Sequence, residues 1–325
     1  MQSSFFNDLH TQGQLSEGSY EKINNAAAGK LFSLHWELKI ILYLGILLLT
    51  GGLGILIYKN IDTLGHQVIL IIIAAISAGS FFYCFKHTST FSTAKVVTAN
   101  SFFNYILLLG SLTFITFIGY LQFQYNVFGN RYGLATFIPM LVLFFSAYYF
   151  DHLGVLTMAI TALATWAGIA VTPLNILRSN DFDSTTIIIT AFLLGITLIT
   201  LGYFSALKNV KKHFEFTYQN FGTHLLFIST LAAIFHFDNL YLLIFLLLVI
   251  ISYLYYLKAK KEKSFYYLVI TSLYFYVGVS YTLLKLLFAG TDSMGAIYLS
   301  FIYFIISAIF LIIFLVKMNK KIKSL

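Results

Sequence analysis

Residues 67–85 read QVILIIIAAISAGSFFYCF, a stretch with no charged side chain. An α-helix rises about 1.5 Å per residue, so about 20 apolar residues are needed to cross the hydrocarbon core of a bilayer. This stretch therefore has the length and composition of one transmembrane helix. Similar stretches recur along the chain and predict ten spans. These are residues 38–58, 67–85, 102–121, 133–150, 153–172, 186–205, 221–237, 239–257, 265–287 and 295–316.

The composition agrees with a chain whose main solvent is lipid. Of its 325 residues, 59% are hydrophobic and only 10% are charged, whereas soluble domains carry about 25% charged residues. We expect an all-α polytopic transmembrane helical bundle of about ten spans, covering residues 37–325. Residues 1–36 are predicted to form a short cytoplasmic amphipathic helical hairpin, with a helix that begins at Glu17 after a Ser16 cap.

The distribution of lysine and arginine predicts the orientation. Loops rich in these residues face the cytoplasm, and one set of alternate loops holds 16 of them, against three in the other set. Both termini are therefore expected in the cytoplasm, and the protein in the inner membrane of a bacterium. The 16 are Lys22, Lys30, Lys39, Lys86, Lys95, Lys208, Lys211, Lys212, Lys258, Lys260, Lys261, Lys263, Lys317, Lys320, Lys321 and Lys323, and the three are Lys59, Arg131 and Arg178.

Several function classes are disfavoured by what the sequence lacks. The net charge of +8 comes from these short clusters rather than from a basic face, so nucleic acid is not an expected partner. No phosphate-binding loop, H-E-x-x-H or G-x-S-x-G motif is present. No catalytic residue, metal ligand or cofactor is assigned, and an enzyme ranks third among the expected functions.

The best candidate site lies on the ninth predicted span. Its hydroxyl-bearing residues and its one lysine repeat at spacings of three and four, which places them on one helical stripe. Such a stripe should face other helices or water rather than lipid, so it indicates either a substrate or ion path or ordinary helix packing. Lys285 is near the outer edge, where a lysine can also extend to the interface. The stripe comprises Tyr267, Thr271, Tyr274, Tyr281 and Lys285, with Gly278 between them.

Polar residues at the outer ends of the spans form a second candidate, an outer vestibule. If they converge on Lys285 they would surround it with polar groups; the alternative is solvated loop ends. The vestibule candidates are Asn60, Asp62, Arg131, Asp238 and Asp292.

The beginning of the chain resembles a known family. Leu9, the segment Gly13-Gln14-Leu15-Ser16, Tyr20 and Ile23 precede a glycine-rich first span with Gly51-Gly52-Leu53-Gly54, which closes in Tyr58-Lys59-Asn60-Ile61-Asp62. These features resemble an uncharacterised bacterial family of predicted multi-spanning membrane proteins over about residues 9–85. In that family a tryptophan is expected where Ile61 stands. The resemblance implies a membrane bundle and no particular activity.

Two functions remain open at this point. The first is a transporter-like bundle for a small or amphipathic solute, with lipid or a lipid-like molecule as a ligand. The second is a non-enzymatic membrane scaffold or subunit that binds a protein partner through residues 1–36. A deep cavity lined by the ninth span would favour the first, and a tightly filled bundle the second.

Reporter fusions test the predicted topology. Fusions after Lys211 and Lys261 should report the cytoplasm, and fusions near Arg131, Arg178 and Asp292 should report the outside, because of the 16 to three lysine and arginine distribution. A cytoplasmic signal at Arg178 would overturn the orientation.

Overall fold

The computed structural model describes residues 10–11, 16–27, 34–96, 101–129, 131–171, 184–290 and 293–323. Within these ranges the chain forms helices and no strand, so the prediction of an all-α membrane bundle is confirmed. The helices are α2 (Glu17–Ala27), α3 (Leu34–Leu64), α4 (His66–His87), α5 (Ser101–Tyr125), α6 (Tyr132–Phe150), α7 (Leu153–Val171), α9 (Thr185–Leu207), η1 (Lys212–Phe214), α10 (Glu215–His236), α11 (Tyr241–Lys261), α12 (Phe265–Gly290) and α13 (Ser293–Lys323).

The ten long helices α3 to α13 of the described chain lie at the ten predicted spans. Eight of them are long and apolar enough to cross a membrane, namely α4, α5, α6, α7, α9, α11, α12 and α13. The other two are α3, whose described apolar stretch is Leu38–Gly52, and α10, which is long enough at 22 residues but more polar. Their crossing of the membrane stays a prediction.

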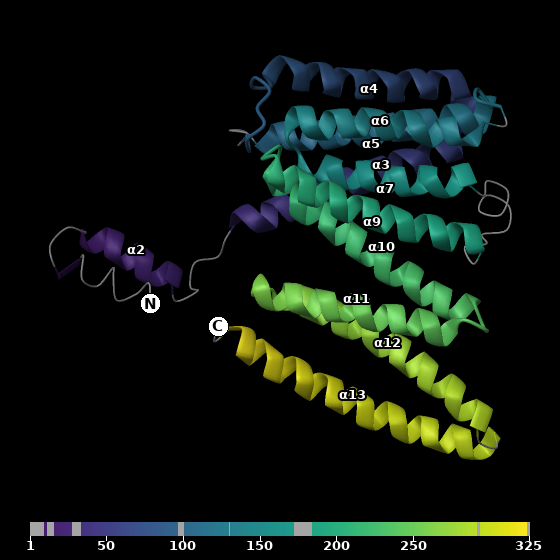
Figure 1. The fold of residues 1–325 in the computed structure, drawn as a ribbon. Coiled ribbons are helices and arrows are strands. Elements are labelled where there is room, and N and C mark those ends of the chain that lie inside the picture. The colour runs from purple at the N-terminus through teal and green to yellow at the C-terminus, as the bar shows by residue number, and fades with distance from the viewer. Residues whose placement is uncertain are drawn as a thin grey trace.

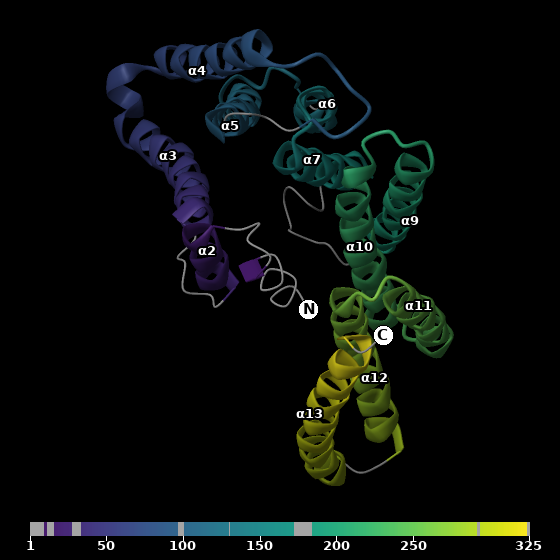
Figure 2. The same cartoon turned by 90° about the vertical axis from the view of Figure 1, so that its left-hand side faces the viewer.

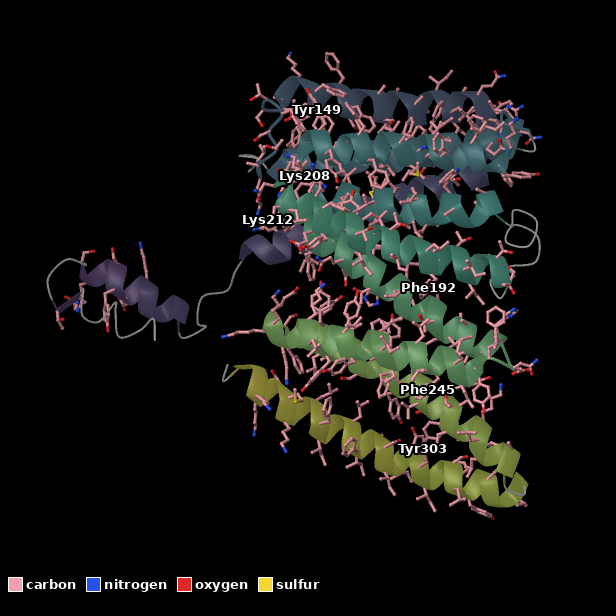
Figure 3. All side chains as sticks on the ribbon, viewed as in Figure 1. Tyr149, Phe192, Lys208, Lys212, Phe245 and Tyr303 are labelled. Carbon is pink, nitrogen blue, oxygen red and sulfur yellow. The ribbon has the colours of Figure 1, made fainter. Side chains whose placement is uncertain are left out.

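The long helices lie side by side, and neighbours in sequence run in opposite directions (Figure 1). The tightest pairs are α4 with α5, α6 with α7, α9 with α10 and α11 with α12. Figure 2 shows that they follow a curve from α3 to α13 that does not close on itself. Helix α3 starts and helix α13 ends at the same end of the row of helices, beyond which α2 extends. Figure 3 labels Lys208 and Lys212 at this end, which we call the lysine-rich end.

The amino-terminal helix begins where the sequence predicted. Helix α2 starts at Glu17, and the Ser16 carbonyl accepts hydrogen bonds from the backbone N–H groups of Ser19 and Tyr20, both at 3.0 Å. The ring of His10 stacks on that of Tyr20, with 4.2 Å between the centroids. The division into a segment of residues 1–36 and a bundle of residues 37–325 stays a prediction.

Helix α10 joins the two hydrophobic cores of the bundle. Its Tyr218 belongs to the core built mainly from α4 to α9, and its Leu226, Phe227 and Leu231 belong to the core shared with α11, α12 and α13. Accordingly α10 contacts α7 and α9 on one side and α11 and α12 on the other. Because the helix has neighbours on two sides, polar residues on those sides avoid lipid.

The sequence placed the start of this helix too late. The span was predicted to begin at residue 221, but α10 begins at Glu215. The first turns carry Thr217 and Gln219, which are buried against neighbouring helices rather than exposed to water. A prediction from hydropathy alone was therefore too short, because it left out polar residues that are buried in the protein.

Helices α9 and α10 approach closely at glycines. A Cβ atom on Gly195 would lie 2.9 Å from the backbone nitrogen of Leu226, and one on Gly222 would lie 2.8 Å from the carbonyl oxygen of Gly195. The Leu226 nitrogen and the Gly195 oxygen belong to the backbone, so neither can move away without shifting a helix. By contrast, a Cβ atom on Gly79 of α4 would meet nothing within 4 Å.

The substitution Gly195→Ala should therefore destabilise the bundle. We expect a loss of about 1 to 3 kcal/mol, the usual range for overpacking, measured as a lower unfolding temperature of the detergent-solubilised protein. The matched control Gly79→Ala should be neutral or slightly stabilising, because alanine favours a helix over glycine. Equal effects of the two changes would contradict the close approach.

Candidate functional site

A buried carboxylate lies at the lysine-rich end, in the turn between α6 and α7. Asp151 follows α6 in the left-handed conformation with φ of 56°, which aspartate tolerates better than most residues. The backbone N–H groups of Asp151 and His152 both bond to the carbonyl oxygen of Ala147, which ends the helix. This turn directs the Asp151 side chain into protein, where only 1% of it is exposed.

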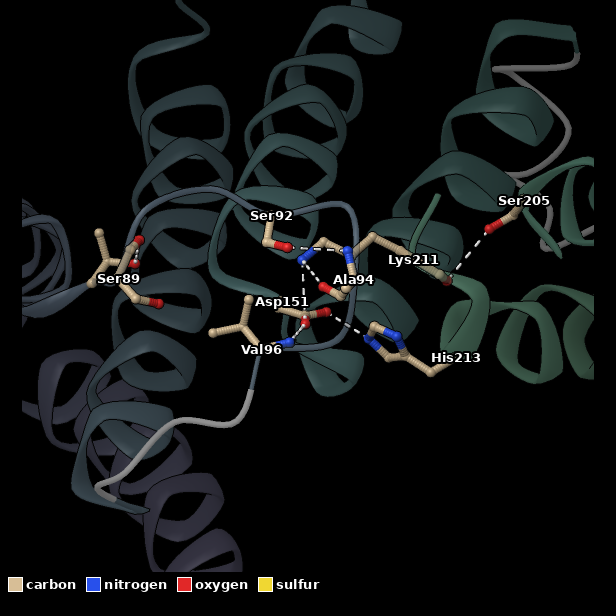
Figure 4. Close-up of polar contacts among 9 residues, drawn as sticks. Ser89, Ser92, Ala94, Val96, Asp151, Ser205, Lys211 and His213 are labelled. Carbon is tan, nitrogen blue, oxygen red and sulfur yellow. Dashed lines mark hydrogen bonds and ion pairs between the residues drawn. The ribbon is translucent and has the colours of Figure 1, made fainter. Parts of the chain in front are cut away.

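The carboxylate of Asp151 is bound by groups from two other connections of the chain (Figure 4). Its Oδ2 lies 3.2 Å from Nζ of Lys211 and accepts a 2.5 Å hydrogen bond from the backbone N–H of Val96. Its Oδ1 lies 2.5 Å from Nε2 of His213. The side chain of Lys211 is completely buried. A buried charge is tolerated when it is paired and hydrogen-bonded. The Asp151 carboxylate and the Lys211 ammonium each meet this condition through the other.

The same contacts fix the connection between α4 and α5. Lys211 donates from Nζ to the carbonyl oxygen of Ala94 at 3.4 Å and from its backbone N–H to that of Thr93 at 2.8 Å. The ring of Phe91 lies 5.5 Å from Nζ. We call Asp151, Lys211 and His213 the Asp151 cluster. It ties together the connections that follow α4, α6 and α9.

His152, next to Asp151, is buried and neutral. Its Nδ1 accepts a hydrogen bond from the backbone N–H of Val155 at 3.1 Å, which caps the start of α7. Burial, aided by the positive charge of Lys39, lowers the pKa of His152 to about 4. The imidazole can therefore act as a hydrogen-bond acceptor at neutral pH.

A cavity of about 670 Å³ adjoins the Asp151 cluster at the lysine-rich end. Its lining includes the basic residues Lys95, Lys212 and His213 and the acidic residues Glu215 and Glu262. We call it the charged cavity. Its size falls within the range of small-molecule sites.

Gln219 and Tyr267 also line the charged cavity and begin a series of polar contacts between α10, α11 and α12. Gln219 donates to Oε1 of Glu215 at 2.7 Å and accepts from Nζ of Lys258 and, at 3.4 Å, from the hydroxyl of Tyr267. One turn further along α10, Thr223 bonds to the hydroxyl of Tyr255 at 2.8 Å.

The next residue of α10 extends this arrangement to the middle of α12. Nδ1 of His224 lies 2.7 Å from the hydroxyl of Tyr274. We call the contacts of Glu215, Gln219, Thr223 and His224 with their partners the polar seam. Polar side chains inside a bilayer usually face the bundle interior and mark functional paths.

The predicted stripe on α12 divides into parts with different surroundings. Tyr267 and Tyr274 belong to the polar seam, whereas Thr271 lines a groove between α11, α12 and α13. Tyr281 packs edge-on against Phe235 with 4.5 Å between the ring centroids. A Cβ atom on Gly278, which lies on the same stripe, would be 2.2 Å from Cδ2 of Leu248. The use of the stripe as a substrate or ion path stays a prediction.

Of the vestibule candidates, the structure joins one to Lys285. Asp238 accepts a 2.5 Å hydrogen bond from Lys285, and this contact lowers the pKa of the Asp238 carboxyl. Nζ of Lys285 also lies 4.2 Å from the ring centroid of Tyr241. The Asp238 side chain is 80% exposed. Arg131 is exposed just before α6. The side chains of Asn60 and Asp62 and all of Asp292 lie outside the described residues.

Reasoning from the sequence missed the Asp151 cluster and the α10 half of the polar seam. Asp151 and Lys211 are 60 positions apart, so no local spacing connects them. A usable signal was present on α10, since Glu215, Gln219 and Thr223 recur every four residues. Among the described residues, no group of His, Cys, Asp and Glu is placed to hold a metal ion.

These features define a polytopic helical membrane protein with a polar site at one end of the bundle. Comparison with known families agrees with this class. Residues 7–156 match the family described as "Predicted membrane protein (DUF2157)". The expected resemblance to an uncharacterised membrane protein family is thereby confirmed, and it extends from residue 85 into α7. No curated protein and no solved structure matches the chain.

The change Asp151→Asn should destabilise the protein strongly. It leaves the buried Lys211 without a counter-charge, and breaking a buried pair in this way costs about 3 to 5 kcal/mol. Thermal unfolding in detergent measures the loss, and Lys211→Met added to Asp151→Asn should restore part of it. Asp238→Asn, which breaks an exposed pair, is the matched control and should change little. Similar losses for the two single variants would contradict the importance of burial.

Proposed function

We propose that the protein is transporter-like and binds a small or amphipathic solute in the charged cavity. The supporting observation is that the polar seam begins at the lining of this cavity, with Gln219 and Tyr267, and reaches Tyr274 nine residues into α12. A nine-residue helical segment measures about 14 Å, close to half of a bilayer core. Polar groups at that depth are expected where a solute or ion passes.

The two signs of charge in the cavity favour a solute with both signs. Lys95 and Lys212 are exposed to the cavity and have no ion-pair partner among the described residues, whereas Glu215 and Glu262 line it from α10 and the end of α11. A zwitterionic molecule, or an amphipathic one with a zwitterionic headgroup, can pair with basic and acidic lining residues at once. A solute with one charge would be repelled by the lining residues of the same sign.

We further propose that the lysine-rich end faces the cytoplasm of a bacterial inner membrane. The 16 to three distribution of lysine and arginine supports this orientation. The charged cavity would then be open to the cytoplasm, and Lys285 with Asp238 would lie at the outer side.

A second function, as a scaffold or subunit, is favoured by a different observation. Helix α2 extends beyond the lysine-rich end, away from the long helices (Figure 1), where a protein partner could reach it. In that case the polar seam would only hold helices together. The two proposals differ in whether water-soluble molecules reach the middle of α12.

Labelling of single cysteines distinguishes them. In a Cys84→Ala background, Tyr267→Cys, Tyr274→Cys and Tyr281→Cys are treated with a charged thiol reagent in membrane vesicles of both orientations. Transport by alternating access predicts labelling at 267 from the lysine-rich side, at 281 from the other side and at 274 from both, because the middle of a path opens to each side in turn.

Two lipid-facing controls set the background. Leu273 and Leu283 on α12 are 47% and 37% exposed on the surface of the bundle, so Leu273→Cys and Leu283→Cys should stay unlabelled in a bilayer. If Tyr274→Cys is labelled as little as these controls from either side, the transport proposal fails and the scaffold is preferred.

A further inference from the structure

A groove of about 530 Å³ lies between α11, α12 and α13, apart from the charged cavity. Half of its 14 lining residues are aromatic, compared with 18% of the whole chain, and none of them is charged. We call it the aromatic groove. On α13 its lining runs from Tyr303, labelled in Figure 3, to Phe314. That part of a helix measures about 17 Å, so the groove is about as long as one leaflet of a bilayer core of about 30 Å.

The aromatic groove is accessible from the lipid. Its wall on α13 belongs to a helix whose most apolar stretch has no buried residue. This helix packs mainly on α12, where Tyr276 bonds to Ser307 at 3.0 Å. On the α11 side, the lining residue Tyr253 is 60% exposed. A hydrocarbon chain dissolved in the bilayer can therefore enter the groove.

Two lysines lie one helical turn beyond the aromatic groove, toward the lysine-rich end. Lys260 follows the lining residue Tyr256 by four positions on α11, and Lys317 follows Phe314 by three positions on α13. Residues at these spacings share one face of a helix. Nζ of Lys260 lies 4.7 Å from the ring centroid of Tyr256, which places this ammonium at the end of the groove.

No carboxylate neutralises either of these lysines within the described ranges of the chain. Neither Lys260 nor Lys317 forms an ion pair there. Lys258, two positions before Lys260, contacts α10 instead, where it bonds to Gln219, and it also lies 3.9 Å from Glu262. Two positive charges at one end of an uncharged aromatic groove complement an anionic group that is attached to a hydrocarbon chain.

We propose that the aromatic groove binds one anionic phospholipid. An acyl chain lies along the aromatic lining, and Lys260 and Lys317 bind the phosphate of the headgroup. Basic pockets between transmembrane helices bind anionic headgroups in the same way. A zwitterionic phospholipid offers an equivalent chain, but the cation in its headgroup offsets the attraction between its phosphate and the lysines. The lysines therefore favour an anionic phospholipid over other hydrocarbon of the bilayer.

Photolabelling tests the binding. The full chain in a neutral detergent is treated with a phosphatidylglycerol that carries a photoreactive diazirine on one acyl chain. We expect the label on peptides of α11, α12 and α13, strong displacement by unlabelled phosphatidylglycerol and much weaker displacement by phosphatidylcholine.

Three results would overturn the proposal. Equal displacement by phosphatidylcholine would indicate a groove for hydrocarbon alone. Displacement by glycerol 3-phosphate, which has the phosphate but no acyl chain, would indicate a site for a soluble anion. Labelling confined to other helices would place the lipid elsewhere.

Charge variants test the two lysines. Lys260→Gln with Lys317→Gln should weaken phosphatidylglycerol binding about 25-fold, because each lysine near an anionic headgroup contributes about fivefold. Phosphatidylcholine binding should not change. The matched control is Lys86→Gln with Lys208→Gln, which removes the same charge from exposed positions at the ends of α4 and α9 and should leave binding unchanged. Equal losses in the two double variants would contradict the assigned contacts.

A variant of the lining tests the position of the acyl chain. Val249→Trp adds bulk to a lining residue of α11 and should strongly reduce photolabelling. Ile250→Trp is the control, because Ile250 is outside the lining and is 50% exposed, and its labelling should match that of the unmodified protein. Equal labelling of the two variants would show that the chain does not lie in the groove.

This inference does not rest on the transport proposal, because the charged cavity and the aromatic groove share no lining residue. Cysteine labelling at positions 267, 274 and 281 can fail while phospholipid binding persists. Loss of phospholipid binding in the lysine variant likewise leaves the charged cavity untouched.

Discussion

Polar side chains inside a bilayer must find partners within the protein, because the lipid supplies none. Helix α10 shows how this requirement arranges the bundle. It carries Gln219, Thr223 and His224, each of which bonds to a neighbouring helix. A helix with such groups cannot lie at the edge of the row, so it lies where α7 and α9 cover one side and α11 and α12 the other. The edge positions are left to α3 and α13, and the described apolar residues of both are largely exposed.

The positions of the helices were predictable because apolar length is a local property. All ten predicted spans overlap with helices in the described chain, and the turn between α6 and α7 was placed within a residue or two. The start of α10 was not predictable from hydropathy, since Thr217 and Gln219 are polar residues buried by other helices. Whether a polar residue faces lipid, water or protein depends on neighbours that are distant in sequence.

The candidate site was predictable only in part, for the same reason. Helical spacing identified Tyr267 and Tyr274 on α12, and both contact polar groups of α10. The same spacing also included Tyr281, which packs on Phe235. The pairing of Asp151 with Lys211 depends on two tight turns, each with a residue at positive φ, that bring separate connections together. Nothing in a single sequence indicates that two such turns meet.

The Asp151 cluster also bears on how the chain is divided. The family match ends at residue 156, so Asp151 and Val96 lie inside it, whereas Lys211 and His213 lie outside it. If the chain were separated between α7 and α9, the first fragment would keep a carboxylate in an apolar environment without its cation, and the second would keep the cation. Neither fragment then has a self-sufficient interior at the lysine-rich end. The region that matches the family is thus joined to the helices that follow it by this ion pair, in which the later part of the chain supplies the cation.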